Sequence, residues 1–360
     1  MADPIDGNRT ARQVRAPSDK GPSDPPVATS RRLARVAPGP AVGVALLAIG
    51  VGWVLIQAFK DGLGNSGNVP QFLIITLGAL SLAGLFFLAA IGLTLIFGLM
   101  RVVNMAHGSL YLVGGYLAWA LTMNAGLDWW LAAAVATLFS GLLGLVMEQV
   151  FLRWNRGQDL RQTLITIAIS VILADQMLSN FGGQPRIIPL PAALAGRMSL
   201  GVYDLSYSSF RLFVIGVAVV IGVLLWLWIQ RTRFGMVIRA GVDDRAMASA
   251  LGVNVPVVFA IAFFVGSCLA GLSGVFGGTM LSLAPGQDAV FLISSIVIVI
   301  VGGMGSLGGA AVGAVLLAFV EQYSGVYLPA GLPPYSMVVT FMLVAAVLAL
   351  RPTGLFGRAT

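Results

Sequence analysis

RAGVDDRAMASALGVNV, residues Arg239–Val255, is a charged, alanine-rich island between two long apolar segments. These segments cover about 210–229 and 256–281, and each is long enough to cross a bilayer as a helix, which takes about 20 mostly apolar residues. A polar segment held between two spans is what a membrane protein needs if a separate protein pushes on it. The island therefore predicts a membrane subunit that is driven by another chain.

The residue types inside the island predict a short helix. Asp243 or Asp244 can cap its start, where negative charge is favourable, and Gly252 is placed to end it in a left-handed turn. One face of this helix then carries small and apolar side chains, those of Ala246, Met247, Ala250 and Leu251. We interpret the helix as a docking element for a groove on a partner. A helix lying on lipid headgroups is the alternative, but the segment has no aromatic anchor.

The composition of the whole chain is that of an integral membrane protein. Of its 360 residues, 58% are hydrophobic and 10% are charged, and 45 are glycine. The single cysteine, Cys268, excludes an intrachain disulfide and leaves the redox compartment open. A net charge of +7 is compatible with nucleic acid binding, but the basic residues fall between the apolar runs. We therefore expect a lipid bilayer and no nucleic acid as the partner, and we interpret the charge as a topology signal.

The apolar runs predict an all-α polytopic bundle of about eight to ten transmembrane helices. Residues 1–40 are rich in Pro, Ser, Asp and Arg and are expected to form a disordered basic tail. The 19 uncharged residues of 41–59 form the first predicted span. Further spans are expected at about 71–98, 109–124, 129–151, 162–180, 210–229, 256–281, 290–303, 309–323 and 335–350. Several of them are short, which predicts tilted, broken or re-entrant segments.

The distribution of Lys and Arg predicts the orientation of the bundle. With ten crossings, seventeen basic residues fall on the side that holds the tail, the 153–161 loop, the 230–255 loop and the C-terminus. Four fall on the other side: Lys60, Arg186, Arg197 and Arg211. Because short loops rich in Lys and Arg stay in the cytoplasm, both termini are predicted to be cytoplasmic. The predicted location is the bacterial cytoplasmic (inner) membrane, which the chain crosses several times.

GLTLIFGLMRVVNMAHG, residues 92–108, places a polar turn near the predicted cytoplasmic end of a span. Its candidate residues are Arg101, Asn104, His107 and Gly108. Polar groups at such a depth need partners and are functional candidates. His107 is the sole histidine and has no cysteine or carboxylate cluster beside it, so we expect no metal site. We interpret the turn as a structural, hinge-like element, with snorkelling of Arg101 as an alternative.

Three carboxylates, Glu148, Asp175 and Glu321, lie within apolar runs. None has an evident basic partner in the sequence, which argues against proton-relay chemistry. Asp175 follows a polar stripe that Thr166 and Ser170 form at i, i+4 spacing. We therefore expect Asp175 to face inward, and we take it with Thr166 and Ser170 as candidate pathway residues.

Two glycine clusters lie at 271–278 and 302–313. Small residues let helices approach closely, which explains the first cluster. The second is too dense in glycine for the interior of a span, so we predict a broken helix there, with Gly302, Gly303 and Gly305 as pathway candidates. The longest outward loop, 181–209, either connects two spans or receives a substrate-delivering protein.

The sequence contains no loop of the form G-x-x-x-x-G-K-[ST], no nucleophile elbow and no zinc-ligand spacing. We therefore expect this chain to be no enzyme, with no catalytic residue and no bound cofactor. If the protein does uphill work with ATP, the ATP and Mg are expected on another chain.

In four segments the sequence resembles the LivH-type permease of branched-chain amino acid ABC importers, in the order that this family has. The segments are 92–116, 164–189 (LITIAISVIL followed by FGGQPRIIP), 239–255 and VGGMGSLGGAAVG at 301–313. The resemblance implies an all-helical permease domain over 71–357. It also implies a second homologous permease subunit, two cytoplasmic ATP-binding subunits and a periplasmic substrate-binding protein as partners.

Residue by residue, the resemblance implies that 239–252 is the segment that contacts the ATPase. The matching residues there are Arg239, Ala240, Asp244, Ala248 and Gly252, and those of the family's Asn-x-Ala-His-Gly motif are Asn104, Ala106, His107 and Gly108. Residues 1–59 are additions to the family pattern. The implied function is import of branched-chain or other neutral amino acids by alternating access. A permease for urea or short amides, and a passive channel or ion-coupled carrier without ATPases, are the alternatives.

Overall fold

The structure is a computed structural model in which the chain divides into two units, residues 1–38 and 39–360. The described residues all belong to the second unit and are 56, 60, 69–100, 103–199, 201, 205–232, 235–236, 254–328, 336–351 and 354–356. The predicted 1–40 tail lies outside the described residues. So do nearly all of the predicted 41–59 span and residues 237–253, which include every predicted ATPase-coupling residue.

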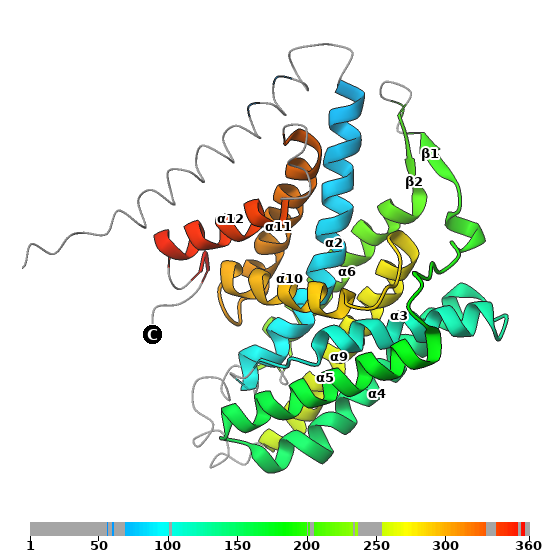
Figure 1. Ribbon diagram of the computed structural model, residues 1–360. Helices are drawn as coiled ribbons and strands as arrows, with labels where there is room; N and C mark the ends of the chain where they lie inside the picture. The colour runs from blue at the N-terminus through cyan, green and yellow to red at the C-terminus, as the bar shows by residue number, and fades with distance from the viewer. Residues whose placement is uncertain are drawn as a thin grey trace, which may run out of the picture. The chain divides into compact units, whose positions relative to one another are not determined.

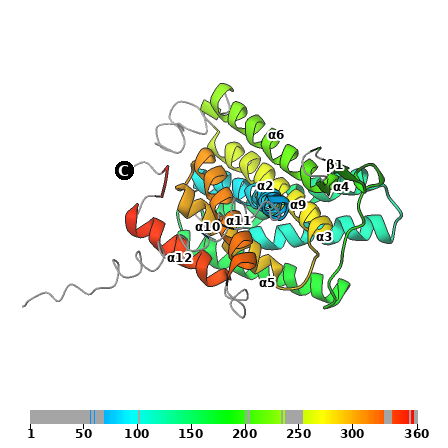
Figure 2. The ribbon, with the colours of Figure 1, turned by 90° about the horizontal axis from the view of Figure 1, so that it is seen from above.

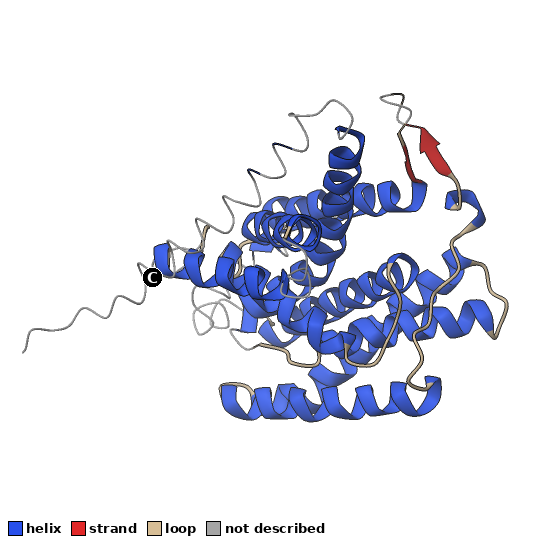
Figure 3. Ribbon diagram, turned by 45° about the horizontal axis from the view of Figure 1, so that its top comes forward, coloured by secondary structure: helices blue, strands red, loops and turns tan. Residues whose placement is uncertain are grey.

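Nine α-helices account for most of the described residues (Figures 1 and 3). They are α2 (Val69–Met100), α3 (His107–Met123), α4 (Trp129–Val146), α5 (Asp159–Phe181), α6 (Ser209–Arg231), α9 (Val255–Met280), α10 (Gln287–Gly302), α11 (Leu307–Tyr327) and α12 (Ser336–Leu350). Between α4 and α5 the chain passes through a π-helical turn, Met147–Leu152, and a 3-10 turn, Arg153–Asn155. Between α5 and α6 it forms a second 3-10 turn, Ala192–Leu194, and an antiparallel pair of strands, β1 (Arg197–Ser199) and β2 (Ser206–Ser208), with Arg197 opposite Ser208.

The helices follow the predicted spans to within four residues at most ends, because long apolar runs are a strong signal for membrane helices. Six helical segments of the described chain are long and apolar enough to cross a membrane: α2, Trp129–Asn155, α5, α6, α9 and α11. The helices α10 and α12 are apolar but shorter, and α3 has 17 residues. The all-α, multi-pass fold is confirmed, and α3, α10 and α12 correspond to the predicted short spans.

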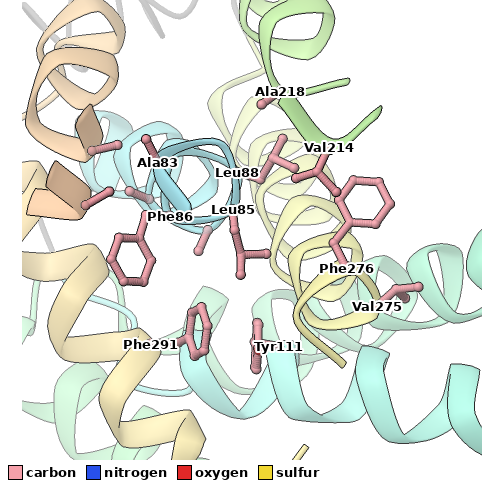
Figure 4. Close-up of a cluster of buried hydrophobic side chains, with 14 of the residues drawn as sticks. Ala83, Leu85, Phe86, Leu88, Tyr111, Val214, Ala218, Val275, Phe276 and Phe291 are labelled. Atoms are coloured by element: carbon pink, nitrogen blue, oxygen red, sulfur yellow. The ribbon is translucent and has the colours of Figure 1, made fainter. Parts of the chain in front are cut away.

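Helix α2 is the central helix of the described bundle (Figure 2). Nineteen of its 32 residues are buried, and its apolar residues cover all faces, as expected for a helix that other helices surround. Phe86 of α2 meets Phe291 of α10 edge to face at 5.9 Å between ring centroids, and Tyr111 of α3 stacks on the same ring at 4.0 Å (Figure 4). On another side of α2, Val214 and Ala218 of α6 join the same buried cluster.

The two halves of the bundle repeat one pattern and interlock. GLTLIFG at 92–98 in α2 is matched by GLSGVFG at 271–277 in α9, and the turns MAHG at 105–108 and LAPG at 283–286 lead into the shorter helices α3 and α10. The helices α3 and α4 pack on α9, whereas α10 and α11 pack on α2. Each half therefore covers the long helix of the other, an internal repeat of the kind that many transporter folds contain.

The two long helices cross at a pair of glycines. A Cβ atom on Gly92 would lie 2.5 Å from the carbonyl oxygen of Gly266, and a Cβ on Gly266 would lie 2.8 Å from that of Gly92. Such distances leave no room for any side chain. Glycine at both positions is therefore what lets the centres of the two halves touch backbone to backbone.

Candidate functional site

The polar turn between α2 and α3 lies inside the bundle. His107, the first residue of α3, is buried, and its Nε2 donates a hydrogen bond to the carbonyl oxygen of Ala89 at 2.8 Å. Its Cε1 would lie 3.2 Å from a Cβ on Gly92, which places the imidazole at the crossing of α2 and α9. The turn therefore lies beside the middle part of α2 rather than at the end of that helix, and its hinge-like role stays a prediction.

The chain reaches this position by doubling back after α2. Ala89 precedes the end of α2 at Met100 by 11 residues, a length of about 17 Å along the helix axis. The seven residues from Met100 to His107 can extend over about 23 Å, which is enough to return along that length. The buried imidazole gains a backbone partner there, the carbonyl oxygen of Ala89. The predicted residue Arg101 lies outside the described part of the chain.

Asn104 holds the shape of the turn. Its Oδ1 accepts a hydrogen bond from the backbone N–H of Ala106 at 3.0 Å, and its carbonyl oxygen accepts one from the N–H of His107 at 3.2 Å. Asparagine is suited to such turns because its side chain bonds to the backbone two residues ahead. Asn104 is itself buried. The arrangement agrees with the interpretation of a structural element.

Gly108 is the point at which α10 approaches α3. A Cβ on Gly108 would lie 2.0 Å from the carbonyl oxygen of Asp288 and 3.0 Å from the Cβ of Leu292. The first turn of α10 therefore lies directly against the first turn of α3. Any residue larger than glycine would separate the two helices, so the motif joins α2, α3 and α10 at one place.

Two hydrogen-bonding side chains of α5 reach the same turn. The backbone N–H of Met105 donates to Oγ1 of Thr166 at 3.2 Å. The Oγ of Ser109 lies 2.8 Å from the Oγ of Ser170 and donates to the carbonyl oxygen of Ser170 at 3.2 Å. The structure thus brings together two sets of candidates that were predicted separately, the Asn-x-Ala-His-Gly motif and the polar stripe of α5.

Asp175 does not join this site. It is exposed, and it lies on the face of α5 that also exposes Leu164, Val171 and Leu178. Asp175 does not face the interior of this chain, because five residues of helix turn it about 140° away from Ser170; its place in a pathway stays a prediction. Helix α5 therefore presents an uncovered apolar face with a carboxylate in it.

Glu148 has a basic partner that the sequence did not reveal. Its side chain is fully buried in the π-helical turn and forms an ion pair with Arg156. The Arg156 guanidinium also lies over the ring of Phe259 in α9, 5.0 Å from the centroid. The partner is eight residues away, and only the π-helical and 3-10 turns between them bring the two groups together. The third carboxylate, Glu321, is half-buried on α11.

The predicted helix break at the second glycine cluster is present between α10 and α11. Gly303 and Gly305 have φ angles of 101° and 80°, which favour glycine. Ser306 caps α11 by accepting a hydrogen bond from the N–H of Gly309 at 3.0 Å. At Gly302 a Cβ would lie 2.3 Å from the backbone of Gly309. The end of α10 and the start of α11 are therefore in backbone contact on the two sides of the break. A role of Gly302, Gly303 and Gly305 in a pathway stays a prediction.

A short C-terminal strap, residues 354–356, closes the end of α10. The N–H of Leu355 donates to the carbonyl oxygen of Val301 at 2.8 Å, and that of Phe356 donates to Gly302 at 3.0 Å. These carbonyls have no partner within their own helix, because the last turn of a helix leaves its C=O groups free. The sequence offered no signal for this contact beyond Gly354, whose φ of 80° permits the turn.

The helices on both sides of residues 237–253 are anchored in the core. Before this segment, α6 packs on α2, and after it α9 packs on α2, α3 and α4. Asn254 caps α9, with its Oδ1 accepting from the N–H of Val257 at 3.4 Å. Beside this start of α9 and the π-helical turn lies an open groove of about 470 Å³, whose polar lining includes Gln149, Arg153 and Asn254. No group of three His, Cys, Asp or Glu residues that could hold a metal ion occurs in the described residues.

Comparison with known proteins identifies relatives of nearly the whole bundle. The family model described as "Branched-chain amino acid transport system / permease component" matches residues 75–348. The branched-chain amino acid permease protein BraD of Pseudomonas aeruginosa is 32% identical over 304 residues, which are 81% of this chain and 97% of BraD. The permease protein LivH of Escherichia coli K12 is 30% identical and is covered to 93%, against 77% of this chain. The autoinducer 2 import permease LsrC of Escherichia coli is 29% identical over 71% of this chain and 72% of LsrC.

Proposed function

The chain belongs to the family of branched-chain amino acid transport permeases, and from this premise we propose that it is the membrane subunit of an ATP-driven importer for branched-chain or other neutral amino acids. The observation that carries the proposal is the family match over 75–348, which runs from α2 into α12 and includes both interlocked halves. The chain is a multi-pass membrane protein and a transport subunit rather than an enzyme. ATP and Mg would bind to partner chains.

The proposed partners are a second homologous permease, two cytoplasmic ATP-binding subunits and a periplasmic substrate-binding protein. The excess of basic residues on one side of the predicted spans supports a location in the cytoplasmic membrane with both termini in the cytoplasm. The uncovered face of α5 supports the proposal that a second permease packs there. A carboxylate such as Asp175 is costly against lipid but not against a protein partner or an aqueous pathway.

In the proposed mechanism, residues 239–252 receive the movement of the ATPases. The proposal rests on their place in the chain between α6 and α9, because both helices contact the central helix α2. A displacement of the segment would act on both helices at once and reach α3 and α4, which pack on α9. The buried turn at Asn104–Ser109 would then act as the hinge, since hydrogen bonds join it to α2 and α5 and α10 approaches it closely at Gly108.

The substrate class is proposed from the names of relatives. BraD and LivH are named as branched-chain amino acid permeases, whereas LsrC is named for autoinducer 2 import. The match to BraD and LivH over 93% or more of their length favours branched-chain amino acids as the substrate class. Membership in this family also disfavours a passive channel or an ion-coupled carrier without ATPases.

Uptake by the assembled importer tests the proposal. The chain is expressed together with candidate partners, a second permease, the ATPases and a binding protein, in a bacterial strain without leucine uptake of its own. We expect ATP-dependent uptake of radiolabelled leucine, isoleucine or valine. Purification of the chain without any co-purifying ATPase would contradict the proposal.

Two substitutions test the coupling segment in that assay. Arg239→Glu and Ala246→Trp should abolish uptake while the ATPases still hydrolyse ATP, because a reversed charge or a large side chain would block docking. Ser249→Ala, in the same segment, is the matched control and should leave uptake unchanged. Normal uptake in both test variants would exclude docking at this segment.

A further inference from the structure

The open groove beside the start of α9 has two unlike ends. One wall is a face of α4 and of the turns that follow it, and the other is a face of α9. The polar lining residues, Gln149, Arg153 and Asn254, gather around the π-helical turn and the start of α9. The other lining residues are apolar and lead away from that end: Leu145, Pro256, Val257, Ala260, Ile261 and Phe264. The groove of about 470 Å³ is therefore polar at one end and apolar along the rest.

The length of this groove is that of one leaflet of a bilayer. At the apolar end α4 and α9 approach closely, and a Cβ on Gly141 would lie 2.9 Å from the ring of Phe264. Phe264 follows Asn254, at the polar end, by ten residues, which is a length of about 15 Å along the helix axis. Because the hydrocarbon core of a bilayer is about 30 Å thick, a molecule in the groove spans about half of it.

The polar end of the groove presents N–H donors and a positive charge that no carboxylate neutralises. Arg153 is exposed, and its Nη1 donates a hydrogen bond to Oε1 of Gln149 at 3.3 Å. No carboxylate of the described chain lies within ion-pair distance of its guanidinium. The amide oxygen of Asn254 accepts from the N–H of Val257. Because both amide oxygens already have donors within the protein, the groups that remain at this end are those that bind an oxyanion.

The surface next to the groove has the character of a lipid contact. Helix α4 contains no charged residue, and its outer face exposes Val135, Leu138, Phe139, Leu142 and Val146. The exposed face of α5 differs, because it includes the carboxylate of Asp175. Trp154 directly follows Arg153 and is 79% exposed, as expected of a tryptophan at the level of the lipid headgroups. These features place the polar end of the groove at the bilayer surface and favour lipid as its neighbour.

We propose that the groove binds one anionic phospholipid of the cytoplasmic leaflet. Its phosphate accepts hydrogen bonds from Arg153 and from the amide N–H groups of Gln149 and Asn254, and one acyl chain lies along α9 toward Phe264. The leaflet follows from the proposed orientation, in which residues 153–161 face the cytoplasm, and anionic lipids are found in that leaflet. The bound lipid joins the end of α4 to the start of α9. Its binding depends on neither the transported substrate nor the ATPases.

Native mass spectrometry of the delipidated full chain with added phosphatidylglycerol tests the headgroup contacts. We expect Arg153→Gln to lower the affinity about tenfold, because a charge-assisted contact to the phosphate is lost. Arg161→Gln is the matched control, since Arg161 is also exposed and donates to Gln158 at 3.1 Å but does not line the groove. Equal affinities of the two variants would overturn the proposal. Displacement of the lipid by an equal concentration of glycerol phosphate would show a site for free phosphate and would also overturn it.

Photolabelling in membranes tests the position of the acyl chain. Phosphatidylglycerol with a photoreactive acyl chain should label Ala260 and Ile261 in the groove more strongly than Val135 on the outer face of α4. Val257→Trp, which fills the groove from a position that is 49% exposed, should remove this preference. Even labelling of all three positions would mean that only bulk lipid surrounds the protein, which overturns the proposal. Loss of the groove labelling once the ATPases are bound would mean that a protein surface occupies the groove, and this also overturns it.

Discussion

Helices α2 and α5 are both long and apolar, yet they are held in the bundle in opposite ways. In the most apolar stretch of α2, 83% of the residues are buried, against 6% in α5. Helix α2 is fixed by backbone contacts that leave no room for a side chain, such as the contact between Gly92 and Gly266. Hydrogen bonds of Met105 and Ser109 to Thr166 and Ser170 hold one face of α5 against the polar turn, and the other face of α5 is uncovered.

Hydropathy alone therefore does not define the role of a membrane helix. A helix fixed by backbone contacts cannot shift without losing packing along its length, since interiors are close-packed. A helix fixed by a few hydrogen bonds can exchange them for others. We therefore expect α2 to behave as a rigid axis and α5 as the element that changes position, and the following experiments test this contrast.

The largest effect is expected at the crossing of α2 with α9. Gly92→Val places new atoms against the carbonyl of Gly266 and should destabilise the protein by about 3 kcal/mol, because neither backbone can give way. Gly216→Val is the control, since nothing lies within 4 Å of a Cβ at that position of α6. The measurement is the thermal unfolding midpoint in detergent. Equal midpoints for the two variants would show that the crossing is not rigid.

A smaller effect is expected where the chain enters α5. Arg156→Gln leaves the buried Glu148 carboxylate without its partner and should cost about 2 kcal/mol. The figure lies below that of a fully buried pair because 21% of the Arg156 side chain is accessible. Arg153→Gln, which loses only an exposed contact to Gln149, should be close to neutral. Chemical denaturation of the two variants compares them, and equal midpoints would contradict a stabilising pair.

Removing the hydrogen bonds of α5 should change the free energy of unfolding still less. It should change the mobility of α5 more clearly. Thr166→Val and Ser170→Ala should each cost about 1 kcal/mol. In the double variant, hydrogen exchange should rise in α5 and not in α2, because the lost bonds join α5 to Met105 and Ser109 and involve no residue of α2. Ser179→Ala, on the exposed part of α5, is the control. Equal increases in both helices would remove the contrast between them.

The smallest effect on stability is expected at Asp175. Asp175→Asn should change the free energy of unfolding by less than about 0.5 kcal/mol, because the side chain is exposed. In the complete importer the same variant should reduce uptake, since the carboxylate would face the second permease or the pathway. Unchanged uptake would mean that Asp175 contacts neither.

Much of the fold could be predicted from the sequence, because apolar runs of membrane length leave few alternatives. The break at Gly303 and Gly305 could be predicted for a similar reason, since so many glycines disfavour a continuous helix. The depth of His107 could not, because the returning chain after α2 has no signal of its own. The exposed position of Asp175 could have been predicted, because its spacing from Thr166 and Ser170 places it on another face of the helix.

The contacts within the candidate site were less predictable than its residues. Both the motif around Asn104 and the stripe on α5 were identified, but the hydrogen bonds between them join residues 61 positions apart in the chain. The pair of Glu148 and Arg156 depends on two irregular turns that no periodic pattern announces. The predicted coupling residues 239–252 lie outside the described chain, so their role stays a prediction.

The C-terminal strap sets an order in time for the making of this protein. Leu355 and Phe356 are synthesised after every helix of the described bundle, and until then the carbonyls of Val301 and Gly302 lack the partners that the strap supplies. The break between α10 and α11 is therefore completed only after all of these helices have been made. A stop codon just before Leu355 would leave the described helices intact and this joint unfinished, so the cell would have to recognise the fault after insertion rather than during it.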